Sequence, residues 1–167
     1  TLGDPKSELS LFLQNHGTVL NYPGWGKAVL NGLKKELKAN QYDIVHAHLG
    51  CWSFICLHYA KRAGVKMRIA HSHSADNFGT MNKTGKVVFA LSKLFNPLVV
   101  TDYMACSDHA CEETFGRKIV GSQSYHRILN PVDERYFLPP DRSIRDELGI
   151  SKESKVVSHV GYMGYHK

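Results

Sequence analysis

The chain has 167 residues, of which 43% are hydrophobic and 22% charged. That length suits about one domain with an ordinary buried core, and the composition excludes an intrinsically disordered chain. Lysine and arginine outnumber aspartate and glutamate by 21 − 15 = 6. This balance suits anionic ligands or the anionic face of a membrane without selecting between them. No run approaches the ~20 apolar residues of a membrane-spanning helix. The basic residues are not interleaved with aromatic ones, so nucleic-acid binding is not expected.

Four cysteines form two pairs, with four residues between the members of each: Cys51 and Cys56, then Cys106 and Cys111. Zinc sites usually have shorter CxxC spacings. We therefore expect buried, reduced thiols, which favour a cytoplasmic protein.

Residues 1–24 give weak signals, a short helix followed by a strand at Thr18–Leu20, and regular alternation begins after them. Apolar residues at helical spacing predict helices, and short β-branched runs between them predict buried strands. The expected helices are Trp25–Asn40, Cys51–Arg62, Lys86–Leu98 (interrupted or ended near Pro97) and Asp108–Phe115, and the expected strands are Tyr42–Ala47, Lys66–His71, Asp102–Cys106 and Arg127–Leu129. Such alternation predicts an α/β fold with a Rossmann-like, doubly wound parallel sheet.

The pattern changes after Asn130. A proline-rich connector leads to a short helix over Ser143–Leu148, with Gly149 as its C-cap, and then to a strand over Lys155–Val160. We expect residues 1–130 to form a partial Rossmann-like domain and residues 131–154 to connect it to a second one. Residues 155–167 are then the first strand and turn of that second domain, so the sequence is interpreted as truncated, with its start also trimmed.

Two predicted strands end in the same pattern, His46-Ala-His48 and His71-Ser-His73. Residues two apart on a strand share a face, and ligands of open parallel sheets bind at the carboxyl ends of strands. Three interpretations compete. The histidines could bind a metal ion, contact a sugar or its phosphate (with His73 favoured), or complete hydrogen bonds at the sheet rim. Later strand ends offer few further ligands, so no metal site is predicted.

Other polar residues follow the same strand ends. Asp76 and Asn77 lie in a glycine-terminated stretch that suits either a loop over a cleft or an ordinary surface connection. Ser107 stands at the N-cap position of a predicted helix, whose free N–H groups could also face an anion. Neither a GxGxxG, a Walker A nor a GxSxG motif occurs.

Four segments in order carry a resemblance: YDIVHAHLG, RIAHSHS, YMACSDHACEETFG, and ILNPVDERYFLPPD leading to RDELGI and VVSHVGYMGYHK. Over roughly residues 41–167 the chain resembles the retaining family-4 glycosyltransferases of GT-B fold, which include capsule and exopolysaccharide enzymes. The resemblance implies a hexosyltransferase that uses a nucleotide sugar, a UDP- or GDP-sugar, and needs no cofactor. It implies a polysaccharide or lipid-linked acceptor bound by the N-terminal domain. With the basic excess, which suits an anionic membrane surface, we expect a cytoplasmic enzyme with peripheral membrane association.

The resemblance also implies roles for single residues. His73 corresponds to a catalytic position near the donor sugar, and the segment from Asn130 to Phe137 corresponds to the crossing between the two domains. Gly161 and Lys167 match a diphosphate-binding G-R-F-x-x-x-K pattern, but Tyr162 and Met163 replace its Arg and Phe. His46, His48, Asp76, Asn77, Ser107 and Asn130 are expected to line the acceptor cleft. Residues 1–167 alone are expected to be inactive.

Two other functions remain open at this point. A metal-dependent hydrolase could use the two HxH pairs, and a non-catalytic α/β module could bind a sugar or nucleotide. Stoichiometric zinc would favour the hydrolase.

Overall fold

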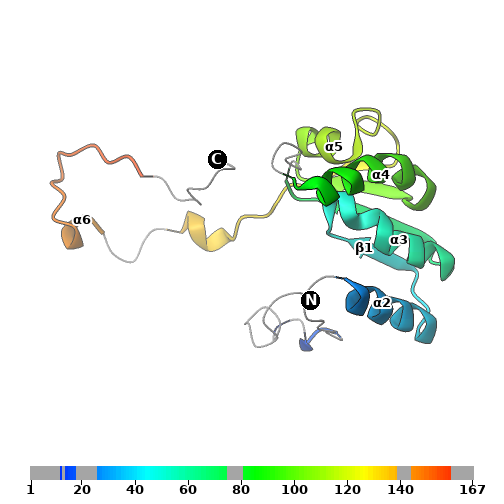
Figure 1. Ribbon diagram of the computed structural model, residues 1–167. Coiled ribbons are helices and arrows are strands. Elements are labelled where there is room, and N and C mark those ends of the chain that lie inside the picture. The colour runs from blue at the N-terminus through cyan, green and yellow to red at the C-terminus, as the bar shows by residue number, and fades with distance from the viewer. Residues whose placement is uncertain (1–11, 13, 18–25, 75–80, 139–143, 159–167) are drawn as a thin grey trace. The chain divides into compact units, whose positions relative to one another are not determined.

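The computed structural model describes residues 12, 14–17, 26–74, 81–138 and 144–158 (Figure 1). The chain divides into two compact units, Thr1–Leu129 and Asn130–Lys167. The regular elements of the first unit are α2 (Lys27–Ala39), β1 (Ile44–Ala47), η1 (Gly50–Trp52), α3 (Ser53–Arg62), β2 (Met67–Ser72), α4 (Lys83–Val99), β3 (Asp102–Ala105), α5 (Asp108–Phe115) and β4 (Tyr125–Arg127). Those of the second are η3 (Glu134–Phe137) and α6 (Ile144–Glu147).

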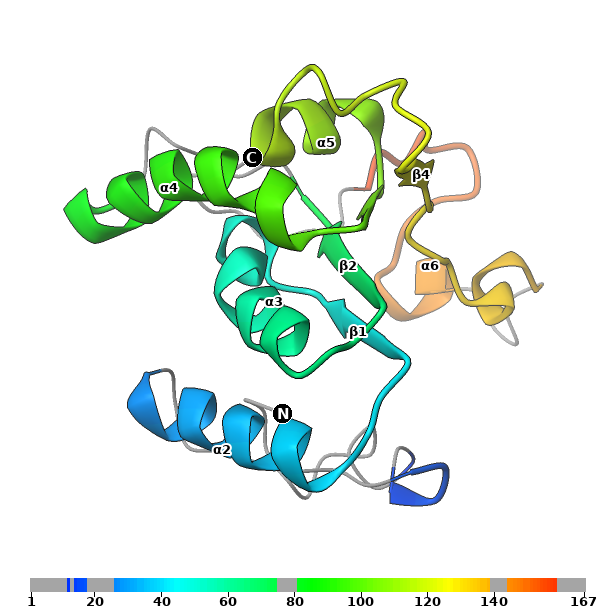
Figure 2. The ribbon, with the colours of Figure 1, turned by 90° about the vertical axis from the view of Figure 1, so that its right-hand side faces the viewer.

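The four described strands form one parallel sheet in the order β1-β2-β3-β4. The predicted parallel α/β fold is therefore confirmed. Because right-handed crossovers between sequential strands place their helices on one face, α3, α4 and α5 all lie on the same side of the sheet (Figures 1 and 2). The reversal of strand order that defines a doubly wound sheet does not occur among these four strands.

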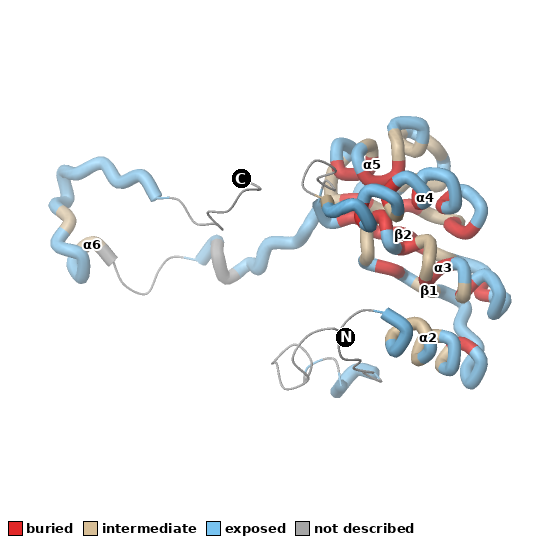
Figure 3. Tube along the Cα trace, in the orientation of Figure 1, coloured by how far each residue is buried: buried red, intermediate tan, exposed pale blue. Residues whose placement is uncertain are grey.

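The core lies between the sheet and these helices, where the buried residues concentrate (Figure 3). Ala47, Ala70 and Ala105 supply its sheet side, and Leu57 from α3 is 0% exposed. Side chains alternate between the faces of a strand. His46 and His71, next to Ala47 and Ala70, therefore lie on the face that α3, α4 and α5 do not cover.

The observed bounds of helix α4 differ from the predicted bounds at both ends. It begins at Lys83 rather than Lys86, because the Asn82 side chain accepts a hydrogen bond from the Gly85 N–H at 2.8 Å and caps the helix. It continues two residues past Pro97. Basic side chains satisfy carbonyls at that end, since Lys61 Nζ donates to the Leu98 carbonyl and Arg68 Nε to the Val99 carbonyl, each at 2.6 Å.

In the second unit, Gly149 ends α6 with a positive φ of 63°, as expected for its C-cap. The Arg145 guanidinium then donates to the carbonyls of Ser151 and Ser154, at 2.9 and 3.1 Å. Residues 155–158, the described part of the strand predicted over Lys155–Val160, have no regular structure, and Val157 is 97% exposed. A strand needs a hydrogen-bonded neighbour, and the described residues offer it none. The predicted boundaries of a second domain remain a prediction.

Candidate functional site

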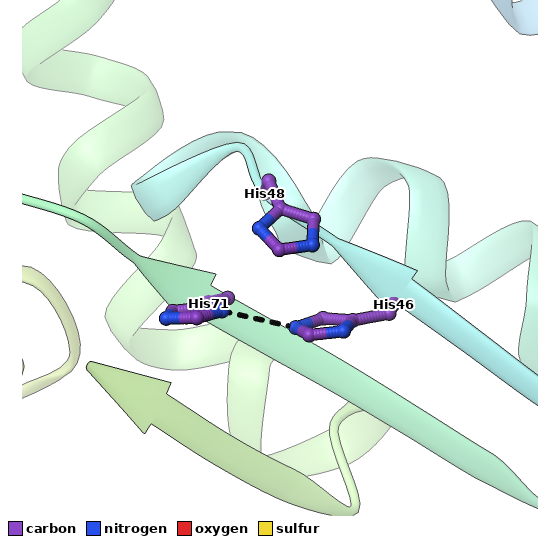
Figure 4. A group of neighbouring side chains, drawn as sticks. All are labelled: His46, His48 and His71. Atoms are coloured by element: carbon purple, nitrogen blue, oxygen red, sulfur yellow. Dashed lines mark hydrogen bonds between the residues drawn. The ribbon is translucent and has the colours of Figure 1, made fainter. Parts of the chain in front are cut away.

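Four histidine rings meet at the carboxyl ends of β1 and β2 (Figure 4 shows three of them). On the face of the sheet that α3, α4 and α5 do not cover, His46 is the last residue of β1 and His71 the last residue of β2. His48 and His73 each follow two residues later in the chain. The ring centroids of His46 and His48 are 4.0 Å apart, those of His71 and His73 4.1 Å, and those of His48 and His71 4.9 Å. The sequence placed each HxH pair at the end of a predicted strand, and the structure brings the two pairs together.

Hydrogen bonds join the rings across the two strands. His46 Nε2 lies 3.1 Å from His71 Nδ1, and His48 Nδ1 lies 2.7 Å from His73 Nε2. Each contact needs one nitrogen that carries a proton and one that offers a lone pair, so both partners cannot be doubly protonated while it persists. The arrangement therefore favours neutral imidazoles.

His71 stands at the base of the cluster. Its side chain is 5% exposed, whereas the other three rings are open to solvent. Burial, followed by the neighbouring His73, His48 and His46, lowers the pKa of His71 to about 4. Burial is also the first cause that lowers the pKa of His46 and of His48. Among the described residues, nothing hydrogen-bonds to His71 Nε2.

The buried His71 predicts acid lability. Its pKa is about 4 in the folded protein and about 6.5 when unfolded, so between these values the unfolded chain binds more protons. The free energy of unfolding should therefore fall as pH drops from about 6.5 toward 4. Urea titrations at several pH values in EDTA-containing buffer measure this slope. His71→Gln should flatten the slope, and an unchanged slope in that variant would contradict the assignment to His71.

The backbone after β2 is fixed by its neighbours. Ser72 Oγ donates to the Ser74 carbonyl at 2.7 Å and contacts Thr114 Oγ1 at 3.0 Å. Cys106 Sγ contacts the His73 carbonyl at 3.0 Å. These contacts hold His73 at one position beside His48.

A cavity of about 560 Å³ adjoins the cluster. Its walls come from α2, the end of β1 and the start of α3, and they include Val29, Leu33, His46, His48, Leu49 and Cys56. Apolar side chains with a few polar groups at one end are typical of small-molecule sites. The cavity can hold an apolar or sugar-like group with its polar end at the histidines.

Ser107 caps α5, as the sequence predicted. Its side chain accepts a hydrogen bond from the Ala110 N–H at 3.1 Å. Ser107→Ala should lower the free energy of unfolding by about 1 kcal/mol, and Ser107→Asn should restore most of it because asparagine is an equally good cap. Urea denaturation compares the two variants. Equal losses in both would show that capping is not the reason.

Not every predicted site residue can be compared with the cluster. Asp76, Asn77, Gly161 and Lys167 lie outside the described residues. Asn130 is exposed and belongs to the second unit. Their expected roles remain predictions.

The family resemblance assigned no role to His71, although it is the most buried ring of the four. One feature of the sequence pointed to His71. Like His46, it is the first histidine of an HxH pair at the end of a predicted strand. Which of four similar rings is covered depends on the packing of neighbouring segments, and no local pattern carries that information.

The comparisons with known proteins point to sugar transfer. The chain is 25% identical over 138 residues to EpsF of Bacillus subtilis (strain 168), a glycosyltransferase by name, covering 78% of this chain and 35% of EpsF. It is 22% identical over 153 residues to the N-acetyl-alpha-D-glucosaminyl L-malate synthase of Bacillus anthracis, covering 87% of this chain and 38% of the synthase. The chain thus spans about a third of the length of these curated relatives. These matches support a glycosyltransferase relationship.

No family model matches the chain, and no solved structure matches it. In the part of the chain that the structure describes, no helix is both long and apolar enough to cross a membrane.

Proposed function

We propose that this chain forms the acceptor-side part of a retaining, family-4 glycosyltransferase of GT-B fold, of the hexosyltransferase type that builds capsule or other surface polysaccharides. The observation that supports this most is the meeting of four imidazoles at the carboxyl edge of a parallel sheet, in a chain related to glycosyltransferases. This edge is where open α/β sheets bind their ligands.

The donor in this proposal is a UDP- or GDP-sugar. In the reaction an acceptor hydroxyl forms a bond to the anomeric carbon, the bond from that carbon to the diphosphate breaks, and the acceptor's proton leaves with the diphosphate. Positive charge develops on the sugar and negative charge on the departing phosphate, so well-placed hydrogen-bonding groups lower the barrier. His73 hydrogen-bonds the donor sugar, and its contact with His48 at 2.7 Å orients its ring.

The acceptor is a glycan or a lipid-linked sugar in the cavity beside His46 and His48. Asp76, Asn77, Ser107 and Asn130 complete the cleft, and Gly161 and Lys167 contact the diphosphate. The formal charge of +6 assists a peripheral approach to an anionic cytoplasmic membrane surface, where such acceptors are carried.

Nucleotide binding measured by calorimetry tests the proposal. The protein expressed from its complete reading frame should bind UDP or GDP with a Kd between about 1 µM and 1 mM. Residues 1–167 alone should bind either nucleotide weakly and show no transfer. Tight binding by residues 1–167, or no binding by the complete protein, would contradict the proposed division of roles.

A further inference from the structure

We propose that His46, His48 and His71 bind a divalent transition-metal ion, with zinc as the expected ion. One ring nitrogen from each can be chosen so that all three lie within 4.8 Å of one another. Imidazole is a common ligand of Zn²⁺, and three histidines are a sufficient protein ligand set for it. The site goes beyond sugar transfer and does not depend on it. Bound zinc by itself is compatible with the proposed transferase, and only zinc-dependent hydrolysis would favour the hydrolase instead.

The spacing between two of the ligands already suits an ion. His46 Nε2 and His71 Nδ1 are 3.1 Å apart. Two nitrogens bound at 2.0–2.1 Å to one tetrahedral zinc are separated by about 3.3 Å. The two nitrogens now face each other in a hydrogen bond, so both rings must turn toward one point beside that line to share an ion. His48 lies to one side of both rings (Figure 4).

The hydrogen bonding of the cluster is incomplete without a further partner. Within the described residues, the side-chain hydrogen bonds of His46, His48 and His71 run only to other histidine rings. His71 Nε2 is buried and has no partner there. A buried polar atom left unsatisfied costs about 1–3 kcal/mol, and such atoms often mark a water or an ion. An ion held by His71 Nδ1 lies on the other side of the ring and leaves Nε2 unsatisfied, so the ion is inferred from the meeting of the three rings.

The sequence predicted no metal site because later strand ends supply few ligands. The structure removes that objection, since β1 and β2 alone bring three imidazoles together. His46 and His48 are exposed, so an ion can enter from solvent. Three neutral imidazoles leave the ion's charge uncompensated and a coordination position open. That position would take water or an anionic oxygen.

Metal binding to the untagged protein, expressed from its complete reading frame and stripped with a chelator, tests the proposal. Equilibrium dialysis should give about one Zn²⁺ per chain. Co²⁺ should give visible d–d absorption that Zn²⁺ abolishes. His48→Gln should weaken zinc binding at least about tenfold, because even partners that only orient a ligand are worth 10–100-fold in affinity.

Two matched variants distinguish a metal site from a histidine rim held by hydrogen bonds alone. His109→Gln, an exposed histidine of α5, should bind zinc like the wild type. His73 is not a proposed ligand but hydrogen-bonds the ligand His48, so His73→Gln should weaken zinc binding less than His48→Gln does. The proposal would be overturned if the wild-type protein bound no more zinc than His48→Gln, or if His109→Gln lost as much zinc binding as His48→Gln. The histidines would then form a rim held by hydrogen bonds alone. If His48→Gln is unfolded by circular dichroism, His46→Gln replaces it, and the cobalt spectrum of the wild type still decides.

Discussion

The rate of sugar transfer is expected to fall about 100-fold when His73 is replaced by glutamine, since a positioned acid–base or hydrogen-bonding side chain contributes about 10²–10⁴-fold. Glutamine keeps a donor and an acceptor but lacks the imidazole ring that the proposed contact uses. The loss should appear in kcat more than in KM, because the proposed contact strengthens as charge develops on the sugar.

The matched control for this variant is His109→Gln, on an exposed surface of α5. It should transfer sugar at the wild-type rate. Steady-state kinetics on the protein expressed from its complete reading frame compare the two, with circular dichroism to confirm folding. A His73→Gln enzyme with wild-type kcat would remove His73 from the proposed site.

Leu57→Ala is expected to lower the free energy of unfolding by about 3 kcal/mol, within the 2–5 kcal/mol that such buried truncations cost. Leu57 is 0% exposed and packs in the core between α3 and the sheet. Removing its branched end loses the transfer free energy of three carbons and leaves a cavity that the close-packed core fills only in part.

Leu94→Ala is the control for this prediction. Leu94 lies on α4 and is 65% exposed, so the same chemical change should alter stability by less than about 0.5 kcal/mol. Urea denaturation at constant m-value gives both differences. Similar losses at the two positions would show that the core has been placed on the wrong face of α3.

The order of elements could be predicted because each carries its own local pattern. The prediction for α5 has the same bounds as the helix, Asp108–Phe115, since Ser107 marks its start and Gly116 its end. The start of α4 was missed by three residues because the capping role of Asn82 was not recognised. The strand at Lys155–Val160 was predicted from β-branched residues alone, whereas strand formation depends on a neighbour far away in sequence.

The position of the candidate site could be predicted in part, because open parallel sheets bind ligands at the carboxyl ends of their strands. The sequence placed His46 with His48 and His71 with His73 at the ends of two predicted strands, and the structure brings these rings together. The hydrogen bonds between rings were not predictable, because they depend on the register of β1 against β2, and the burial of His71 was not predictable because it depends on the packing of neighbouring segments. That register pairs Ala47 with Ala70, and only this pairing brings His48 beside His71.

Transfer of a radiolabelled sugar from a panel of UDP- and GDP-sugars to a lipid extract tests the central claim most directly. The protein expressed from its complete reading frame should incorporate label from one donor and release the matching nucleoside diphosphate in equal amount. His73→Gln should reduce both together. If no donor of the panel is consumed while the protein hydrolyses other substrates in a zinc-dependent way, the histidine cluster belongs to a hydrolase and the proposed glycosyltransferase function is wrong.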